Sequence, residues 1–283
     1  MNEQFKEQIK KELMERLGSD FRVDFKTMCK ANRTYTGLVI HRIGTTVAPI
    51  IAIESFCQKF IDGISVEVIA NEVMDIYNMA NQTTPSVDIE NMLQDSKKYG
   101  FRMIGIKNNQ QYLKEIDYIK IADDYALIPI IYAIENGVIA VKKDVMKRIN
   151  ITIEEFIEIA KKNEYERGIL IQSLKRLTGF EDDLESELYV VTFNDTVNGA
   201  CAIVYEDILE KVSKKMGSNS FYILPSSVHE TICVQCADAH YADALQLKLI
   251  VQEINATMVS EDDILGDTVL LYDHNSKKIV KMV

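Results

Sequence analysis

Apolar residues recur at helical spacing near the start of the chain. Phe5, Ile9 and Leu13 follow one another at four-residue steps, and Gly18 comes after them. Four-residue steps place side chains on one face of a helix, and glycine commonly ends one. The pattern therefore predicts an amphipathic helix over residues 3–17. We expect further helices over residues 54–61, 65–77, 152–160, 206–216 and 242–255.

Runs of strand-forming residues occupy the intervals between these helices. They cover residues 21–25, 37–42, 101–106, 127–134, 138–142, 188–193, 200–205, 221–224, 231–236, 267–272 and 278–282. Asn136-Gly137 lies between 127–134 and 138–142, and Asn-Gly readily adopts the positive φ angles of a type I′ turn. We expect these two runs to form an antiparallel hairpin closed by a two-residue turn at Asn136-Gly137.

The order of the elements indicates a fold class. Strand runs come in neighbouring pairs, with helices between the pairs, which favours an α+β fold over a doubly wound parallel sheet. We expect antiparallel strand pairs that alternate with amphipathic helices. The acidic stretch 181–187 interrupts the pattern. It suggests two subdomains, an N-terminal one over residues 1–180 and a C-terminal one over 181–283, with a single domain as the alternative.

Composition limits the partners. The 283 residues include 43 acidic and 32 basic side chains, which gives a net charge of −11. Such a chain repels nucleic-acid phosphates and anionic membranes on average, so we expect it to bind neither directly. The first ten residues lack the apolar segment of a signal peptide, and no run approaches 18 apolar residues. Together with five cysteines, an odd number, these features favour a cytoplasmic location.

Common catalytic and cofactor-binding motifs are absent from the sequence. It contains no glycine-rich phosphate-binding loop, no His-Glu-x-x-His and no Gly-x-Ser-x-Gly. No reaction class is indicated, and we expect no cofactor.

One cysteine pair has a spacing found in metal sites. Cys233-Val-Gln-Cys236, with His240 nearby, resembles half of a zinc site. Structural zinc takes four ligands, however, and a strand points residues 233 and 236 to opposite faces. We expect reduced, buried cysteines and no bound metal, with a zinc site at Cys233, Cys236 and His240 as the alternative.

The segment 224–230 has the most unusual local composition. Its sequence, Leu-Pro-Ser-Ser-Val-His-Glu, gathers two hydroxyls, an imidazole and a carboxylate. Ser227, His229 and Glu230 are residue types that act as nucleophile, base and orienting acid in hydrolases. The Ser227–Glu230 spacing also fits a helix capping box, and the composition fits a tight turn between two strands. We expect a structural cap or turn, with ligand binding through Ser226, His229 and Glu230, or catalysis, as alternatives.

Four stretches resemble an uncharacterised bacterial family of unknown function found in low-GC Gram-positive bacteria. They are Thr36–Ile40, Val47–Phe56 with Gly63, Phe221–Glu230, and Val251–Asn255 leading to Asp267. The Leu-Pro-Ser-Ser-x-His-Glu string is the most specific of them. Ala52 and Cys57 depart from the family pattern, which usually has Tyr or Leu at the first position and Tyr at the second; the differences look like packing changes. The resemblance covers nearly the whole chain and implies a compact fold, but no activity.

These observations favour a non-enzymatic interaction protein whose partner is another protein. The hypothesis includes a link to mobile elements or host defence, for example as an inhibitor of a basic nucleic-acid-handling enzyme. A hydrolase that uses Ser227, His229 and Glu230 is the alternative, and a small metal-binding module at Cys233, Cys236 and His240 is a third hypothesis. The sequence does not indicate an oligomeric state.

Overall fold

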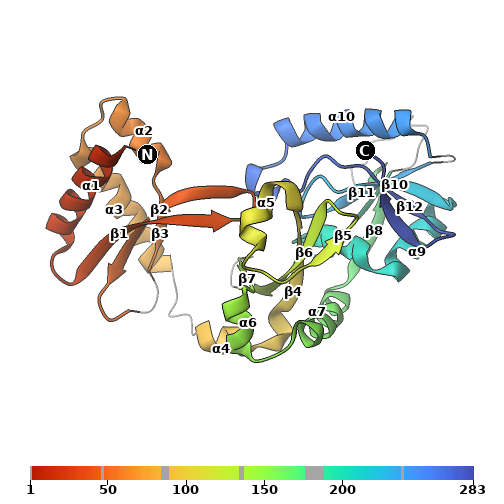
Figure 1. Cartoon of the computed structure of the whole chain (residues 1–283), viewed down its shortest axis with the longest axis horizontal. Coiled ribbons are helices and arrows are strands. Elements are labelled where there is room, and N and C mark those ends of the chain that lie inside the picture. The colour runs from red at the N-terminus through yellow and green to blue at the C-terminus, as the bar shows by residue number, and fades with distance from the viewer. Residues whose placement is uncertain (1, 46–47, 84–88, 134–136, 176–187, 237–238) are drawn as a thin grey trace. The chain divides into compact units, whose positions relative to one another are not determined.

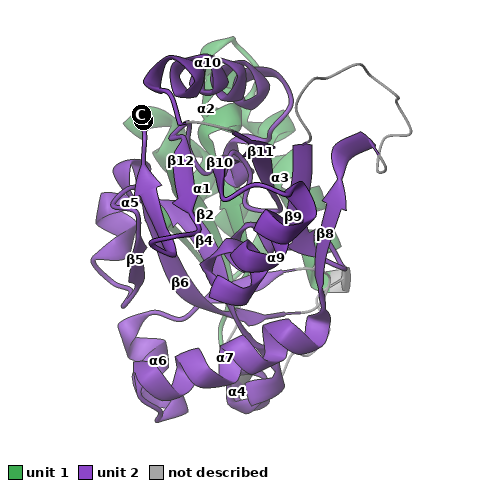
Figure 2. Ribbon diagram, turned by 90° about the vertical axis from the view of Figure 1, so that its right-hand side faces the viewer, with its two compact units in different colours: residues 1–88 green, residues 89–283 purple. Residues whose placement is uncertain are grey.

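The protein divides into two compact units, residues Met1–Asp88 and Ile89–Val283 (Figure 2). The computed structural model describes residues 2–45, 48–83, 89–133, 137–175, 188–236 and 239–283. The subdomain boundary suggested by the acidic stretch falls within 176–187, outside the described residues, and strands on both sides of it pair in one sheet. Among the described residues, no helix combines the length and apolar character needed to cross a bilayer.

Unit 1 is a small antiparallel sheet with three helices. Its elements are α1 (Glu3–Leu17), β1 (Phe21–Lys30), β2 (Arg33–Arg42), β3 (Ile50–Ala52), α2 (Glu54–Ile61) and α3 (Val66–Thr83). The strand order is β1-β2-β3. Phe5, Ile9 and Leu13 of the predicted helix are fully buried in a core shared with side chains of β2 and α3. The amphipathic stripe therefore identified both the helix and its buried face.

Unit 2 contains two antiparallel sheets with helices around them (Figure 1). Its helices are α4 (Ile89–Gln94), α5 (Ile106–Leu113), α6 (Lys143–Ile149), α7 (Ile153–Arg167), α9 (Glu206–Met216) and α10 (Tyr241–Thr257), with 3₁₀ turns η1 (Ser96–Lys98), η3 (Gly199–Val204) and η4 (Glu261–Asp263). Its strands are β4 (Tyr99–Gly105), β5 (Ile119–Ile121), β6 (Tyr125–Tyr132), β7 (Val138–Ala140), β8 (Ile169–Ser173), β9 (Leu188–Phe193), β10 (Ser220–Leu224), β11 (Thr231–Gln235), β12 (Leu270–Asp273) and β13 (Lys278–Lys281).

The two sheets of unit 2 differ in size and in strand order. The larger sheet has the order β13-β12-β10-β11-β9-β8, and the smaller has β4-β6-β5 with β7 also paired to β6. All strand pairs described are antiparallel, so the predicted α+β fold is confirmed. Helix α10 packs on the larger sheet, where Ala244 and Val251 meet Tyr222 and Val234 (Figure 1).

The hairpin between β6 and β7 differs from the prediction in its turn. The two strands pair antiparallel, as expected, but Tyr132 lies opposite Val138. The amide of Ala133 then donates to the carbonyl of Gly137 at 2.8 Å. A two-residue turn at Asn136-Gly137 would instead have placed residue 135 opposite Val138. The pairing is confirmed and the two-residue turn is wrong; residues 134–136 lie outside the described chain.

The strand expected over residues 200–205 is also wrong. Gly199–Val204 form the 3₁₀ turn η3, and Ala200, Cys201 and Ile203 are fully buried. A short apolar run does not distinguish a buried strand from a buried helical turn. Asn198, in the left-handed region with a φ of 53°, starts the turn. A side chain at Gly199 would collide with Thr192 and with the carbonyl of His229, so glycine permits this close approach.

Candidate functional site

The segment Ser226–Glu230 connects β10 to β11. The Ser227 hydroxyl accepts a hydrogen bond from the backbone amide of His229 at 3.1 Å, and the Ser226 carbonyl accepts one from Leu265 at 2.9 Å. Both serines are buried. The segment is therefore a tight connection between two strands, as one of the expected alternatives proposed. No helix begins there, so the predicted capping box of Ser227 with Glu230 is wrong.

The imidazole of His229 is held by groups other than Ser227. Its Nδ1 atom lies 3.2 Å from the carbonyl oxygen of Thr196 and 3.5 Å from the amide nitrogen of Asn198. Its Nε2 atom lies 3.4 Å from Oδ1 of Asp263. Because both ring nitrogens face these partners, this geometry does not support His229 as the base that activates Ser227.

Three of the predicted residues nevertheless share one cavity. Ser227, His229 and Glu230 line a hollow of about 440 Å³. The other lining residues are Thr196, Val197, Met258, Val259, Ser260 and Asp263. The carboxylate of Asp263 is already engaged, since Ser260 donates to it at 2.6 Å and the Arg102 guanidinium lies 3.6 Å away.

Backbone strain marks the edge of this hollow. Thr196 has a φ of 59°, which is unusual for a β-branched residue. Arg167 holds the surrounding turn by donating to the Val197 carbonyl at 2.8 Å and to both carboxylate oxygens of Asp195 at 2.6 and 2.8 Å. Burial would raise the pKa of Asp195, but the hydrogen bonds from Arg167 and Val197 outweigh it and lower that pKa.

A buried carboxylate lies deeper in unit 2. Glu164 of α7 is fully buried and accepts hydrogen bonds from the Phe101 amide at 2.7 Å and the Tyr205 hydroxyl at 2.5 Å. The Cys201 thiol lies 3.8 Å away. Burial raises the pKa of Glu164 to about 7, although Tyr205, Phe101 and Arg167 oppose the shift. Glu164 does not line the hollow next to His229, so its position favours a role in linking α7, β4 and η3.

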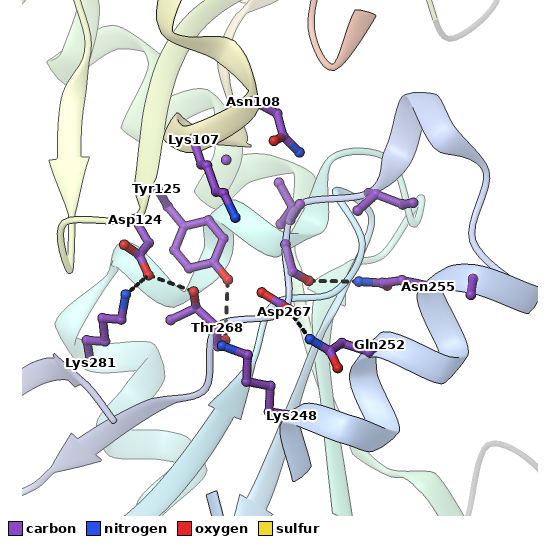
Figure 3. A pocket seen from close by; sticks show the side chains of 15 residues that line it. Lys107, Asn108, Asp124, Tyr125, Lys248, Gln252, Asn255, Asp267, Thr268 and Lys281 are labelled. Atoms are coloured by element: carbon purple, nitrogen blue, oxygen red, sulfur yellow. Dashed lines mark hydrogen bonds and ion pairs between the residues drawn. The ribbon is translucent and has the colours of Figure 1, made fainter. Parts of the chain in front are cut away.

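A second cavity, of about 520 Å³, lies elsewhere in unit 2 (Figure 3). Four distant segments and one strand form its wall: the start of α5, the residues that begin β6, the second half of α10, the connection 264–268, and β13. The lining residues are Gly105, Lys107, Asn108, Asp124, Tyr125, Lys248, Gln252, Asn255, Ala256, Ile264, Leu265, Gly266, Asp267, Thr268 and Lys281.

One side of this cavity is a fixed polar wall. Asp124 binds Lys281 at 2.7 Å and accepts a hydrogen bond from Thr268 at 2.6 Å. Burial would raise the pKa of Asp124, but the hydrogen bonds from Lys281 and Thr268, together with the charges of Lys281 and Lys248, outweigh it and lower that pKa. The Tyr125 hydroxyl donates to the Thr268 carbonyl at 3.3 Å, and burial raises the pKa of this phenol. Asp124 therefore stays ionised and Tyr125 neutral near pH 7.

Two further lysines, Lys107 and Lys248, line this cavity without forming a salt bridge of this kind, although Lys248 is close enough to Asp124 to help lower its pKa. Within the described part of the chain, neither Lys107 nor Lys248 has a carboxylate within 4.0 Å. Figure 3 shows the Lys107 side chain extending from α5 towards the connection that carries Asp267. Gln252 donates a hydrogen bond to Asp267, and Asn255 donates to the Gly266 carbonyl at 2.8 Å. The cavity thus combines two available ammonium groups with amides and one carboxylate.

A glycine allows this cavity to form. Gly105 precedes α5, and a side chain there would collide with the backbone carbonyl of Leu265. Glycine therefore lets the connection 264–268 approach the start of α5. Sequence reasoning missed this cavity because its wall is assembled from distant segments. The one signal was the resemblance stretch 251–255 leading to Asp267, which contains Gln252 and Asn255.

The cysteine pair is divided between two faces of the larger sheet. Cys236 joins the core beneath α10 together with Val234, whereas Cys233, one residue earlier than Val234, points to the other face. Both cysteines are buried, and burial raises the pKa of the Cys233 thiol. His240 is exposed and precedes α10. Over the described ranges, no three His, Cys, Asp or Glu residues form a group that could hold a metal ion.

Comparison with known proteins gives a family but no activity. A family model described as a family of unknown function, DUF5688, matches residues 2–274. Neither the curated proteins nor the solved structures gave a match. Because the family model spans nearly the whole sequence, the chain belongs to the DUF5688 family.

Proposed function

We propose that unit 2 is a non-enzymatic binding module that takes a small anionic ligand into the cavity of Figure 3. The observation that carries this proposal is the pair Lys107 and Lys248, which line the cavity without a carboxylate at salt-bridge distance in the described ranges. The protein has 43 acidic side chains and a net charge of −11. Two unpaired cations in one hollow of such a protein form a local positive field that attracts anions.

The size of the cavity fits this proposal. Small-molecule sites usually enclose about 300–1,000 Å³, and this cavity measures about 520 Å³. Its fixed polar wall is already ordered by the bonds of Asp124 with Lys281 and Thr268, so a ligand would bind to a largely formed site.

Catalysis is less well supported. In the larger cavity, Asp124 is bound to Lys281 and Tyr125 is kept neutral, so neither of these two residues is a free base or an ionised nucleophile. In the smaller cavity, both nitrogens of His229 face groups other than Ser227. We therefore favour binding over the hydrolase hypothesis.

The test compares two matched double variants. Lys107→Ala with Lys248→Ala removes both cations, whereas Lys162→Ala with Lys214→Ala removes two exposed lysines that do not line the cavity. We expect calorimetry to show that the unaltered protein binds inorganic phosphate or citrate. The first variant should lose affinity at least about tenfold, or about 1.4 kcal/mol, and the second should keep it. Equal binding by both variants, or no binding of either anion to the unaltered protein, would contradict the proposal.

Binding of another protein, and a link to mobile elements or host defence, stay predictions. The feature that favours a protein partner is an exposed apolar row on α10, formed by Tyr241, Leu245 and Leu249 at four-residue steps. Tyr241 and Leu249 are 62% and 66% exposed, and contiguous exposed apolar side chains often mark interaction surfaces. Whether Leu249→Ser releases a co-purified partner from the native cell is the relevant measurement.

A further inference from the structure

The cavity of Figure 3 presents hydrogen-bond acceptors next to its cations. Oδ2 of Asp267 accepts from Gln252, while Oδ1 has no hydrogen-bond partner in the part of the chain that the structure describes. The Asn108 amide at the start of α5 also has no such partner there. An ionised carboxylate only accepts hydrogen bonds, and an amide both donates and accepts. The cavity is therefore suited to a ligand that carries hydroxyl groups as well as negative charge.

The balance of charge supports the same conclusion. Asp124 is paired with Lys281 and also attracts Lys248. Neither Lys107 nor Lys248 has a carboxylate at salt-bridge distance among the described residues, and Asp267 is the other carboxylate of the lining. A bare anion would gain from both lysines but would be repelled by Asp267. A ligand that turns its anionic group towards the lysines and a hydroxyl towards Asp267 satisfies all three groups.

The aromatic lining of the cavity narrows the class of ligand further. Tyr125 is the one aromatic side chain among the described lining residues; it is 1% exposed, and its hydroxyl is bound to the Thr268 carbonyl. The cavity therefore offers no open ring face on which a nucleobase could stack. A nucleotide would leave its base without this common contact, whereas a sugar or polyol has no need of one.

We propose, on the basis of the function proposed above, that the ligand is a phosphorylated sugar or polyol. Its phosphate binds Lys107 and Lys248, and its hydroxyls bind Asp267 and the Asn108 amide. Gln252 is a positioning residue, because its bond to Asp267 fixes which carboxylate oxygen remains available.

The experiment is a calorimetric comparison on the full chain. The probes are glucose 6-phosphate, glycerol 3-phosphate and inositol monophosphate, set against inorganic phosphate, AMP and glucose. We expect at least one phosphorylated polyol to bind ten or more times more tightly than inorganic phosphate and AMP, and glucose alone to bind too weakly to detect.

Variants test which residues cause the preference for a phosphorylated polyol over inorganic phosphate. Asp267→Asn should reduce the preference for the phosphorylated polyol over inorganic phosphate to less than threefold, because the amide keeps the shape but removes the charged acceptor. Affinity for inorganic phosphate should stay the same or rise, because the repulsion is lost. Asn108→Ala, an exposed position, provides a second test that does not depend on Asp267. Glu253→Gln, on the exposed side of α10, is the matched control.

The outcomes separate this inference from the proposed function. If inorganic phosphate or AMP binds with the expected lysine dependence but no phosphorylated polyol binds more tightly, the ligand class is wrong and the anion site stands. If a phosphorylated polyol binds more tightly but Asp267→Asn and Asn108→Ala leave the preference unchanged, the assignment of its hydroxyls is wrong. If none of the anions binds, both proposals fail.

Discussion

Glu164 is the group in which burial and ionisation oppose each other most directly. It is fully buried, and its pKa is raised from an ordinary value of 4.5 to about 7. Between these two values the unfolded chain has lost the proton that the folded protein keeps. Unfolding then releases a proton, so this group makes the folded state less stable as pH rises from about 4.5 to about 7. Below 4.5 both states are protonated, and above 7 both are ionised, so the contribution is constant outside this window.

We predict that Glu164→Gln removes this pH dependence. Glutamine keeps an acceptor for the Phe101 amide and cannot ionise. One pKa unit corresponds to about 1.4 kcal/mol, so the unaltered protein should lose up to about 3 kcal/mol of unfolding free energy between pH 4.5 and 7 through this residue. Urea unfolding at pH 5 and pH 7.5 measures the difference. Glu158→Gln, on an exposed part of the same helix, is the control. An unchanged pH dependence in Glu164→Gln would show that its ionisation does not limit stability.

At the residue scale, the sequence indicated some of the side chains that line the cavities but not what they contact. Ser227, His229 and Glu230, which stood out by their unusual local composition, line one cavity. The contacts that orient His229 come from Thr196, Asn198 and Asp263, which lie 31 to 34 positions away in the sequence. No local sequence pattern indicates them. Lys107 and Lys248 look like ordinary surface lysines in the sequence. Only the folded chain shows that they share a hollow.

At the scale of elements, predictions from neighbouring residues were correct where the stabilising interaction is between residues close in sequence. Thr152 and Glu155 form a capping box at the start of α7, within the helix predicted over residues 152–160, with hydrogen bonds of 3.2 and 2.8 Å. The hairpin of β6 and β7 was placed correctly, but its register, with Tyr132 opposite Val138, differs from the one that a two-residue turn at Asn136-Gly137 would give. In η3, long-range packing around Gly199 decided between a strand and a helical turn.

The connection between β10 and β11 yields a second stability prediction. Ser227→Ala removes the acceptor of the His229 amide in a buried position, so the unfolding free energy should fall by about 1–3 kcal/mol. Glu230→Ala should change it by less than about 0.5 kcal/mol, because the reciprocal bond of a capping box is not formed. Thermal and urea unfolding of both variants measure these two changes in unfolding free energy. Equal losses would favour the capping box instead.

At the scale of the whole molecule, the core of unit 1 is complete within its own sequence. Its buried cluster contains residues from each of α1, α2 and α3 and from the three strands, and all of them lie between positions 5 and 77. Asn2 caps α1 by accepting a hydrogen bond from the Phe5 amide at 3.1 Å. The hairpin of β1 and β2 closes locally, with Lys30 opposite Arg33. The interactions that order this core are therefore supplied by a single continuous segment.

We predict that a fragment of residues 1–88 folds independently. Chains of this length can bury enough apolar surface to form a stable domain, and small domains usually unfold in one cooperative step. Circular dichroism should show mixed helix and strand with a sigmoidal thermal transition. Leu13→Ala, at a fully buried position, should lower the unfolding free energy of the fragment by about 2–5 kcal/mol. Lys11→Ala, on the exposed side of α1, should change it little. A fragment without a cooperative transition would show that this core needs residues 89–283 to form, although every side chain in its cluster comes from the first unit.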